Sequence, residues 1–262
     1  MSTKLSVNLN KVALLRNART IGIPSVLRAA EICIDAGAQG ITVHPRPDER
    51  HIRRQDVFEL AEMLKAAPEV EFNIEGNPFP EFMELVLKVK PAQCTLVPDS
   101  PEAFTSDHGW DLREHGESLR PIIRRLKDAG IRTSLFMDAD PDQVGLARTV
   151  GADRVELYTE PYAASFARGT NVEETLEEFR NAAEKAQSIW LGVNAGHDLN
   201  LQNLPLFCTI PNILEVSIGH ALISDALEMG LANTVRAYLK ILSEAERAEL
   251  EASRSAGLIA KV

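Results

Sequence analysis

The sequence has few cysteines and no long apolar run. Only Cys33, Cys94 and Cys208 occur among 262 residues, and none belongs to a CxxC pair. Isolated cysteines in odd number are typical of free thiols in a reducing compartment, so we expect a cytoplasmic protein. No stretch of 18 apolar residues is present, and the start MSTKLSVNLNKV has no apolar segment behind a basic one. We therefore expect neither a membrane span nor a secretory signal.

Positive charge is also scarce, and it is unevenly spread. The chain has 28 Lys and Arg against 38 Asp and Glu, a formal net charge of −10. Nucleic-acid binding needs a basic footprint, so this balance argues against a nucleic-acid partner. Residues 1–54 nevertheless carry nine Lys and Arg against four Asp and Glu, a local +5. This local excess suggests that a small anionic ligand binds near these residues.

The chain alternates between short β-branched runs and longer segments with helical spacing. The expected strands are Leu5–Asn10, Gly40–Pro45, Glu71–Glu75, Gln93–Pro98, Arg132–Asp138, Arg154–Thr159, Gly192–Ala195 and Ile213–Ile218. The expected helices are Ser25–Gly37, Asp56–Ala67, Phe82–Val89, Ser118–Ala129, Asp142–Val150, Val172–Trp190 and Ala221–Leu242. This alternation without hairpin signals predicts parallel strands, and about eight units predict an α/β fold of the (β/α)8 TIM-barrel type with extra helices.

The alternative architecture is an open doubly wound sheet. That fold would place a glycine-rich phosphate loop after the first strand, and NLNKVALLRNAR contains no glycine. We expect one barrel domain over residues 1–262, with a peripheral C-terminal helix and tail at about 243–262. About twenty residues, DSPEAFTSDHGWDLREHGES, follow Pro98; they predict a lid or an extra helix, for which 111–117 is the candidate. A second irregular loop is expected at 163–171.

Ionisable side chains collect where the expected strands end. In a parallel barrel these ends form one rim, which carries the active site. His44, Glu75, Glu156, His197 and His220 all lie at or just beyond strand ends. Histidine and a buried glutamate are suited to acid–base chemistry near neutral pH. The alternatives are structural: Glu75 could pair with an arginine, and Glu156 could form an ion pair inside the barrel.

Two groups of residues around this rim suggest anion binding. Arginine is suited to bidentate contacts with phosphate, and four arginines follow the first two strands: Arg16, Arg19, Arg46 and Arg50. His51 lies beside them, although it could simply pack. Across the rim, Gly196 and Gly219 allow close approach of the backbone, and a helix beginning near Ala221 would offer free N–H groups. We expect either one bisphosphate or two monophosphates.

These residues occur in segments that resemble the pyridoxine 5′-phosphate synthase family of vitamin B6 biosynthesis. The segments are VNLNKVALLRNAR, GITVHPRPDERHI, FNIEGNP, SLFMDAD, VNAGHDLN and EVSIGHALISDAL, in order from about residue 4 to 240. The resemblance implies a (β/α)8 barrel assembled as a homo-octamer. It also implies condensation of 3-amino-2-oxopropyl phosphate with 1-deoxy-D-xylulose 5-phosphate to pyridoxine 5′-phosphate, phosphate and water, with no metal or organic cofactor.

The resemblance also implies roles for individual residues. His44, Glu75 and His197 match the acid–base residues of the family, and Glu156 matches a residue that assists the transition state. The contacts to the amino-ketone phosphate match Asn8, Arg19, Gly219 and His220. The contacts to the deoxyxylulose phosphate match Arg46, His51 and Thr105, the last within the long loop that resembles the closing lid of the family.

Three positions depart from the common family pattern. Asn10 stands where aspartate is common, Lys11 where histidine is common, and Asp198 where glycine is common. Asn10 can form hydrogen bonds but cannot ionise. Lys11 can supply positive charge to a phosphate. Asp198 changes the backbone contact expected after His197, and we keep all three as candidate substrate-binding residues.

Other functions remain open at this point. A metal-dependent sugar-phosphate isomerase or epimerase could use His44, Glu75, Asp138 and His197 as ligands of Zn²⁺ or Mn²⁺, although Asp138 could instead cap the next helix. The three departures would also suit a non-catalytic relative that binds phosphorylated ligands. A Schiff-base aldolase is weaker, because Lys11 is its only candidate lysine.

Overall fold

The chain folds as a closed barrel of eight parallel strands in sequence order, so the expected (β/α)8 architecture is confirmed. The computed structural model describes residues 2–101, 103 and 105–259. The strands are β1 (Lys4–Asn8), β2 (Gly40–Val43), β3 (Glu71–Gly76), β4 (Gln93–Leu96), β5 (Arg132–Met137), β6 (Arg154–Tyr158), β7 (Gly192–Gly196) and β8 (Ile213–Ile218). β1 pairs with both β2 and β8, which closes the barrel.

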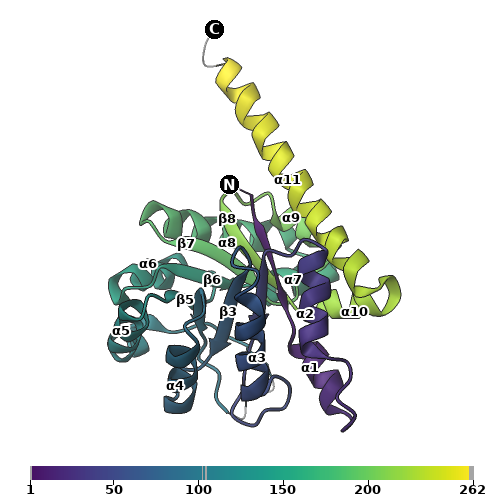
Figure 1. The fold of residues 1–262 in the computed structure, drawn as a ribbon. Coiled ribbons are helices and arrows are strands. Elements are labelled where there is room, and N and C mark those ends of the chain that lie inside the picture. The colour runs from purple at the N-terminus through teal and green to yellow at the C-terminus, as the bar shows by residue number, and fades with distance from the viewer. Residues whose placement is uncertain (1, 102, 104, 260–262) are drawn as a thin grey trace.

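Helices surround the barrel and connect its strands (Figure 1). They are α1 (Asn10–Asn17), α2 (Val26–Asp35), α3 (Arg54–Leu64), α4 (Pro80–Val89), α5 (Leu112–Asp128), α6 (Pro141–Val150), α7 (Glu160–Arg168), α8 (Val172–Ser188), α9 (Leu204–Phe207), α10 (His220–Met229) and α11 (Leu231–Ile259). Each expected strand has a counterpart here, with ends shifted by a few residues, and each expected helix overlaps one or two of the observed helices.

Three local expectations are corrected by the structure. The candidate extra helix at 111–117 is the first part of α5, which begins after its capping residue Asp111 and continues to Asp128. The expected loop at 163–171 is largely the helix α7, which ends at Arg168 and is followed by Gly169 in the left-handed conformation. The expected helix at 221–242 divides at Gly230, where φ is +77°. In the long connection after Pro98, positions 102 and 104 lie outside the described residues.

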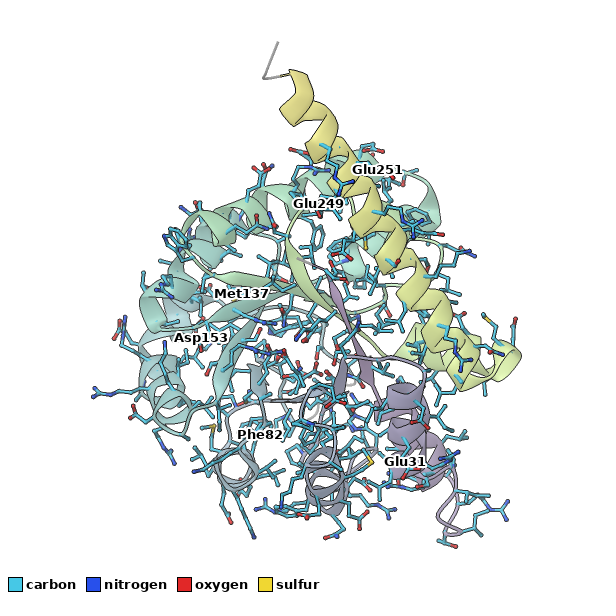
Figure 2. The ribbon with its side chains drawn as sticks, turned by 45° about the horizontal axis from the view of Figure 1, so that its top comes forward. Glu31, Phe82, Met137, Asp153, Glu249 and Glu251 are labelled. Atoms are coloured by element: carbon cyan, nitrogen blue, oxygen red, sulfur yellow. The ribbon has the colours of Figure 1, made fainter. Side chains whose placement is uncertain are left out.

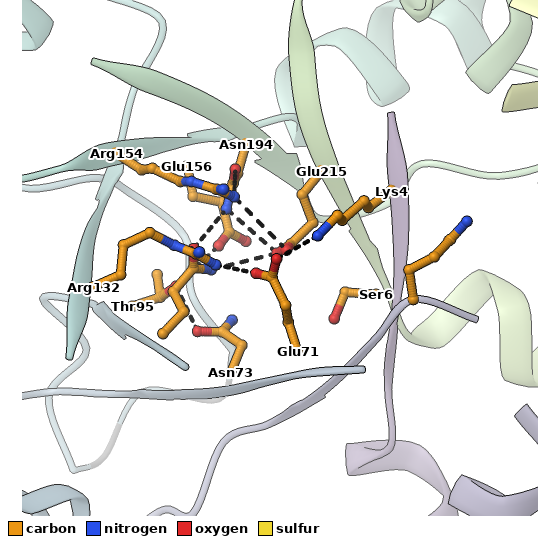
Figure 3. Close-up of polar contacts among 12 residues, drawn as sticks. Lys4, Ser6, Glu71, Asn73, Thr95, Arg132, Arg154, Glu156, Asn194 and Glu215 are labelled. Atoms are coloured by element: carbon orange, nitrogen blue, oxygen red, sulfur yellow. Dashed lines mark hydrogen bonds and ion pairs between the residues drawn. The ribbon is translucent and has the colours of Figure 1, made fainter. Parts of the chain in front are cut away.

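The two faces of the strands are chemically different. Apolar side chains such as Leu5, Val7 and Ile41 are fully buried beneath the helices. The barrel interior is instead lined by polar groups that partner one another, as buried polar groups generally must. Figure 3 shows this interior cluster, in which Arg132 pairs with Glu71 and donates to Gln93 at 2.9 Å. Arg132 and Glu71 are the first residues of β5 and β3, so this ion pair lies at the amino-terminal end of the barrel, opposite the rim.

The C-terminal helix α11 begins against the barrel and then projects beyond it (Figure 1 and Figure 2). Leu242 is buried, whereas Leu250 is 53% exposed. The single-domain interpretation with a peripheral C-terminal segment stays a prediction, and residues 260–262 of that segment lie outside the described chain. Among the described helices, none has the length and apolar character needed to cross a membrane.

Candidate active site

His44 and Glu75 lie together at the carboxyl ends of neighbouring strands. His44 directly follows β2, and Glu75 is near the end of β3. The Nδ1 atom of His44 lies 3.9 Å from Oε2 of Glu75, and both residues are buried. Asn8, at the end of β1, donates from Nδ2 to the same glutamate oxygen at 3.4 Å. In the described chain no arginine forms an ion pair with Glu75, so the structural alternative of an arginine partner is not favoured.

Asn8 and Asn10 connect this pair to the start of α1. The Oδ1 atom of Asn8 accepts a hydrogen bond from the backbone N–H of Asn10 at 3.0 Å. The Oδ1 atom of Asn10 accepts in turn from the backbone N–H of His44 at 2.9 Å. Asn10 therefore holds the backbone of His44 through a hydrogen bond, and an amide oxygen accepts this bond without being ionised. Gly219 lies against Asn8, since a Cβ there would be 3.1 Å from the Cβ of Asn8.

The surroundings of this pair favour the neutral form of both groups. Burial raises the pKa of Glu75 well above its usual value, and electrostatic repulsion from the carboxyl groups of Glu156 and Asp99 raises that pKa further. Burial lowers the pKa of His44 well below its usual value, and the nearby Arg46 lowers that pKa further. At neutral pH the pair therefore offers a carboxylic acid that can donate a proton and an imidazole that can accept one.

Glu156 occupies the barrel interior beneath the rim (Figure 3). Its Oε2 atom accepts from the Thr95 hydroxyl at 3.3 Å. Burial, with the negative charge of Glu215, raises the pKa of Glu156 to about 8. The alternative interpretation of Glu156 was an ion pair inside the barrel, but the interior ion pairs drawn in the figure are formed by Glu71 and Glu215. Gly196 makes room for Glu156, because a Cβ at Gly196 would lie 2.5 Å from its Oε1 atom.

His197 follows β7 and contacts two other parts of the rim. Its Nε2 atom lies 3.1 Å from the Thr105 hydroxyl of the β4–α5 loop, and its ring meets the edge of Tyr158 at 5.1 Å between centroids. Its Nδ1 atom lies 2.9 Å from Oδ2 of Asp198. The structure therefore joins three of the expected site residues in one chain of contacts.

Arg46 and His51 lie on the β2–α3 connection, next to His44. Arg46 is buried, pairs with Asp99 and donates to the carbonyl of Ala103 at 2.8 Å. The His51 ring accepts the backbone N–H of Ile52 at Nδ1, at 2.9 Å. Burial and the charge of Arg46 lower the pKa of His51 to about 4. Neutral His51 therefore carries its proton on Nε2, where it can donate a hydrogen bond to an anion.

The remaining arginines of the expected anion site have different surroundings. Arg16 is buried in an ion pair with Asp56 and donates to the carbonyl of His51 at 3.1 Å, so its role is structural. Arg50 donates to the carbonyls of Ala103 and Pro101. Arg19 is exposed just beyond the end of α1. Three of the four arginines, Arg16, Arg46 and Arg50, therefore form contacts within the protein, whereas Arg19 faces solvent.

Side chains at the starts of α1 and α10 both act on Asp198, which follows β7. Lys11 and His220 both act electrostatically on Asp198 and lower its pKa, after the larger effect of the hydrogen bond from His197. His220 is the first residue of α10, and Gly219 before it leaves the helix N-terminus without a side-chain cap. The backbone N–H groups there remain available to an anion.

A cavity of about 480 Å³ opens beside the catalytic candidates, and its wall includes His44, Arg46 and Asp99. Asp99 and Ser106, which hold Arg46 in place, were missed by sequence reasoning, because no local pattern marks a contact between separate loops. Asp138 does not cap the helix that follows it; Asp140 does, while Asp138 accepts the backbone N–H of Gly109 at 3.0 Å.

The metal-site alternative finds no support in this geometry. Over the part of the chain that the structure describes, no three His, Cys, Asp or Glu side chains are grouped so that they could hold a metal ion. His44 and Glu75 are close to each other, but Asp138 and His197 do not complete a ligand set with them.

The closed parallel barrel, with His44 and Glu75 buried side by side at its carboxyl-terminal rim, defines a (β/α)8-barrel protein. The family model described as "Pyridoxal phosphate biosynthesis protein PdxJ" matches residues 5–244. The chain belongs to this family.

Curated relatives agree over nearly their whole length. A protein of Albidiferax ferrireducens named "Pyridoxine 5′-phosphate synthase" is 56% identical over 250 residues, which are 93% of this chain and 99% of the relative. A protein of the same name from Bacteroides thetaiotaomicron is 55% identical over 241 residues, 92% of this chain and 99% of the relative.

Solved structures of low identity support the fold alone. The 3-hexulose-6-phosphate synthase from Salmonella typhimurium has a TM-score of 0.61 at 15% identity, covering 93% of this chain and 100% of that one. The thiamine phosphate pyrophosphorylase from Pyrococcus furiosus has a TM-score of 0.58 at 13% identity, covering 93% and 96%.

Proposed function

We propose that this chain is a pyridoxine 5′-phosphate synthase. It condenses 3-amino-2-oxopropyl phosphate with 1-deoxy-D-xylulose 5-phosphate to pyridoxine 5′-phosphate, inorganic phosphate and water. The observation that carries the proposal is the buried His44–Glu75 pair, set 3.9 Å apart in a chain whose curated relatives bear this name. A condensation of an amine with a ketone needs one group to give a proton and one to take it, which the pair supplies.

The first chemical step follows from the protonation states of this pair. The amine nitrogen of the amino-ketone attacks the ketone carbon of the sugar phosphate, and the carbonyl oxygen leaves as water. Glu75, protonated because burial raises its pKa, donates a proton to that oxygen. His44, neutral because burial lowers its pKa, accepts the proton released from nitrogen. These transfers give a carbinolamine. Protonated His44 then donates a proton to its hydroxyl group, which leaves as water, while ionised Glu75 takes the second proton from nitrogen, so that the imine forms and both groups return to their starting states.

Later steps eliminate phosphate and close the ring. We assign His197 to protonation near the carbonyl at ring closure, because its Nε2 atom faces the rim beside Thr105. Glu156 lies below the rim with a pKa of about 8, so it can exchange a proton near neutral pH and assist the transition state. Both assignments use side chains already held in place by the barrel.

The two phosphate groups would bind at two separate places on the rim. The amino-ketone phosphate is assigned to Asn8, Arg19, Gly219 and His220, where the N-terminus of α10 offers backbone N–H groups. The sugar phosphate is assigned to Arg46, His51 and Thr105. Asn10 and Lys11 are assigned to substrate binding between these two places, with Lys11 supplying positive charge.

The assembly and location are also proposals. Leu14, Leu15, Ile21 and Ile23 are between 42% and 63% exposed on α1 and the segment after it. An apolar patch of this kind supports burial against another copy of the chain, in agreement with the homo-octamer that the resemblance implies. We also propose a cytoplasmic location, supported by the free thiols of Cys33, Cys94 and Cys208.

The decisive experiment supplies both substrates to the purified chain. We expect pyridoxine 5′-phosphate to form and one phosphate to be released for each product molecule. The same assay with Glu75→Gln, which keeps the size of the side chain but removes its acidic proton, should lose most of this activity. Binding of both substrates without turnover in the unmodified chain would overturn the proposal in favour of a phosphate-ligand-binding protein.

A further inference from the structure

His197 and Asp198 form a consecutive pair with an unusual backbone conformation. Their φ angles are +89° and +62°, in the left-handed region that favours glycine. The surrounding structure holds this conformation from two sides. The Thr159 hydroxyl contacts the carbonyls of Gly196 and His197, and Asn203 donates from Nδ2 to the carbonyl of Asp198 at 3.1 Å. Backbone strain that is held in this way is typical of functional sites.

The consequence of this backbone is a direct contact between the two side chains. The Nδ1 atom of His197 lies 2.9 Å from Oδ2 of Asp198. The hydrogen bond from His197 and the charges of His220 and Lys11 lower the pKa of Asp198, so its carboxylate is ionised at neutral pH. An ionised carboxylate can only accept a hydrogen bond. The proton of the neutral imidazole therefore lies on Nδ1.

The opposite side of the imidazole is directed at the rim. With the proton on Nδ1, the Nε2 atom carries the lone pair, and it lies 3.1 Å from the Thr105 hydroxyl. The ring plane is fixed by its edge contact with Tyr158 at 5.1 Å. Asp198 itself is 40% exposed at its side chain, and His197 is 24% exposed. The carboxylate of Asp198 therefore acts on the site indirectly, through its contact with His197.

We infer that Asp198 is a positioning residue for His197 rather than a contact to a substrate phosphate. It selects the tautomer with the proton on Nδ1, presents Nε2 to the reacting groups, and stabilises the imidazolium that forms when Nε2 gains a proton. This inference rests on the proposed function for its role in turnover, but the tautomer itself can be measured without substrate. It also explains why Asp198, at a position with left-handed backbone, carries a carboxylate side chain.

The test compares the unmodified chain with Asp198→Asn and Asp198→Gly. Asparagine keeps the size of the side chain and tolerates the left-handed backbone, but lacks the charge; glycine removes the side chain and suits the backbone angle. In each protein the nitrogen shifts of ¹⁵N-labelled histidine give the tautomer of His197, whose signal is identified by its loss in His197→Gln. Steady-state kinetics give kcat and KM for both substrates.

We expect the unmodified chain to carry the proton on Nδ1, and both variants to lose that preference. We expect kcat to fall about tenfold, at the lower end for orienting carboxylates because Asp198 is partly exposed. KM should stay within about twofold, and the melting temperature of Asp198→Gly should not fall. Glu114→Gln is the matched control, since it removes a carboxylate next to His115 on the surface of α5 and should change neither kcat nor the His197 signals.

Two results would overturn the inference. One is an unchanged tautomer in both variants. The other is a large rise in KM for either substrate with kcat unchanged, which would make Asp198 a substrate-binding residue. If the unmodified chain forms no pyridoxine 5′-phosphate but the tautomer still depends on Asp198, the proposed function fails while the positioning of His197 stands.

Discussion

The imidazole of His44 and the carboxyl group of Glu75 lie 3.9 Å apart, at the ends of neighbouring strands, with their pKa values shifted in opposite directions. Burial acts on both groups, and it disfavours the charged form of each. Nearby arginines oppose a positive charge on His44, while nearby carboxylates oppose a negative charge on Glu75. One environment thus prepares a proton acceptor and a proton donor side by side.

Substituting Glu75 by glutamine tests the proton donor directly. We expect Glu75→Gln to lower kcat by about 10²- to 10⁴-fold, the usual contribution of a positioned acid or base. KM should change little, because the amide keeps the shape and the contact with Asn8. Steady-state kinetics with both substrates measure this. A variant with full kcat would remove Glu75 from the mechanism.

The coupling of the two groups can be measured with a double-mutant cycle. Because His44 and Glu75 act on the same proton transfers, the double variant His44→Gln/Glu75→Gln should be barely slower than the slower single variant. Effects on log kcat that simply add would show that the two residues act in separate steps. Circular dichroism of each variant controls for loss of fold.

Glu156 should make stability depend on pH in a defined direction. Its pKa is raised from 4.5 to about 8 in the folded chain, so between these values the folded state binds the proton more tightly than the unfolded state. The free energy of unfolding therefore falls as pH rises through this window. Glu156→Gln removes the effect. At pH 8 it should be at least about 1 kcal/mol more stable than the unmodified chain, about 2–4 °C in melting temperature.

The comparison for Glu156 needs a matched surface glutamate. Glu177 on α8 is exposed, with its Oε2 atom 3.1 Å from Nε of Arg180. Glu177→Gln should change the melting temperature by the same small amount at pH 5 and pH 8. If Glu156→Gln behaves in the same way, the carboxyl group is not held protonated in the folded chain.

Asn17 at the end of α1 should control the loop that carries His51. Its Nδ2 atom is 3.2, 3.1 and 2.8 Å from the carbonyl oxygens of Glu49, Arg50 and His51. Asn17→Ala should destabilise the fold by about 1–2 kcal/mol, from net values near 1 kcal/mol per hydrogen bond. Loosening His51 should also raise KM for the sugar phosphate more than KM for the amino-ketone. Calorimetry and kinetics measure the two effects.

A second asparagine provides the control for Asn17. Asn233 on α11 is exposed, and it also donates from Nδ2 to a backbone carbonyl, that of Met229, at 3.0 Å. Asn233→Ala should leave both KM values unchanged. Equal effects of the two substitutions on KM would contradict a specific link between Asn17 and the His51 loop.

The periodicity of the sequence is enough to predict the barrel and the rim that joins His44 to Glu75. Each strand end follows from a local run of residues, and closure of the barrel then brings separate ends together. Contacts between loops are not local, and they could not be predicted. From the sequence, Arg16 was expected to bind an anion. In the structure it pairs with Asp56, forty positions later, which also caps the start of α3.

Conformation at single residues was equally hidden. The left-handed backbone of His197 and Asp198 depends on bonds from Thr159 and Asn203, which are distant in sequence from one another. The division of the last helices at Gly230 could have been noticed, since glycine commonly ends a helix. The continuous apolar spacing on both sides of Gly230 masked that signal.

Gly196 should be intolerant of even one added methyl group. A Cβ there would lie 2.5 Å from Oε1 of Glu156 and 3.2 Å from the carbonyl oxygen of Ser217, so Glu156 or the strand must move. We expect Gly196→Ala to cost about 1–3 kcal/mol in stability, as overpacking does. It should also lower kcat by at least about tenfold, because small displacements of catalytic groups are costly. Thermal unfolding and steady-state kinetics measure both.

A rescue and a control separate this clash from a general effect of alanine. Shortening the opposing side chain in Gly196→Ala/Glu156→Asp should recover much of the lost stability, since it removes the atoms that collide. Gly145→Ala adds the same methyl group within α6, where its nearest neighbour is the flexible end of Lys185 at 3.0 Å. That substitution should leave kcat unchanged and preserve or raise the melting temperature, because alanine favours helix over glycine. A Gly196→Ala enzyme with normal kcat would show that the position of Glu156 does not matter for turnover.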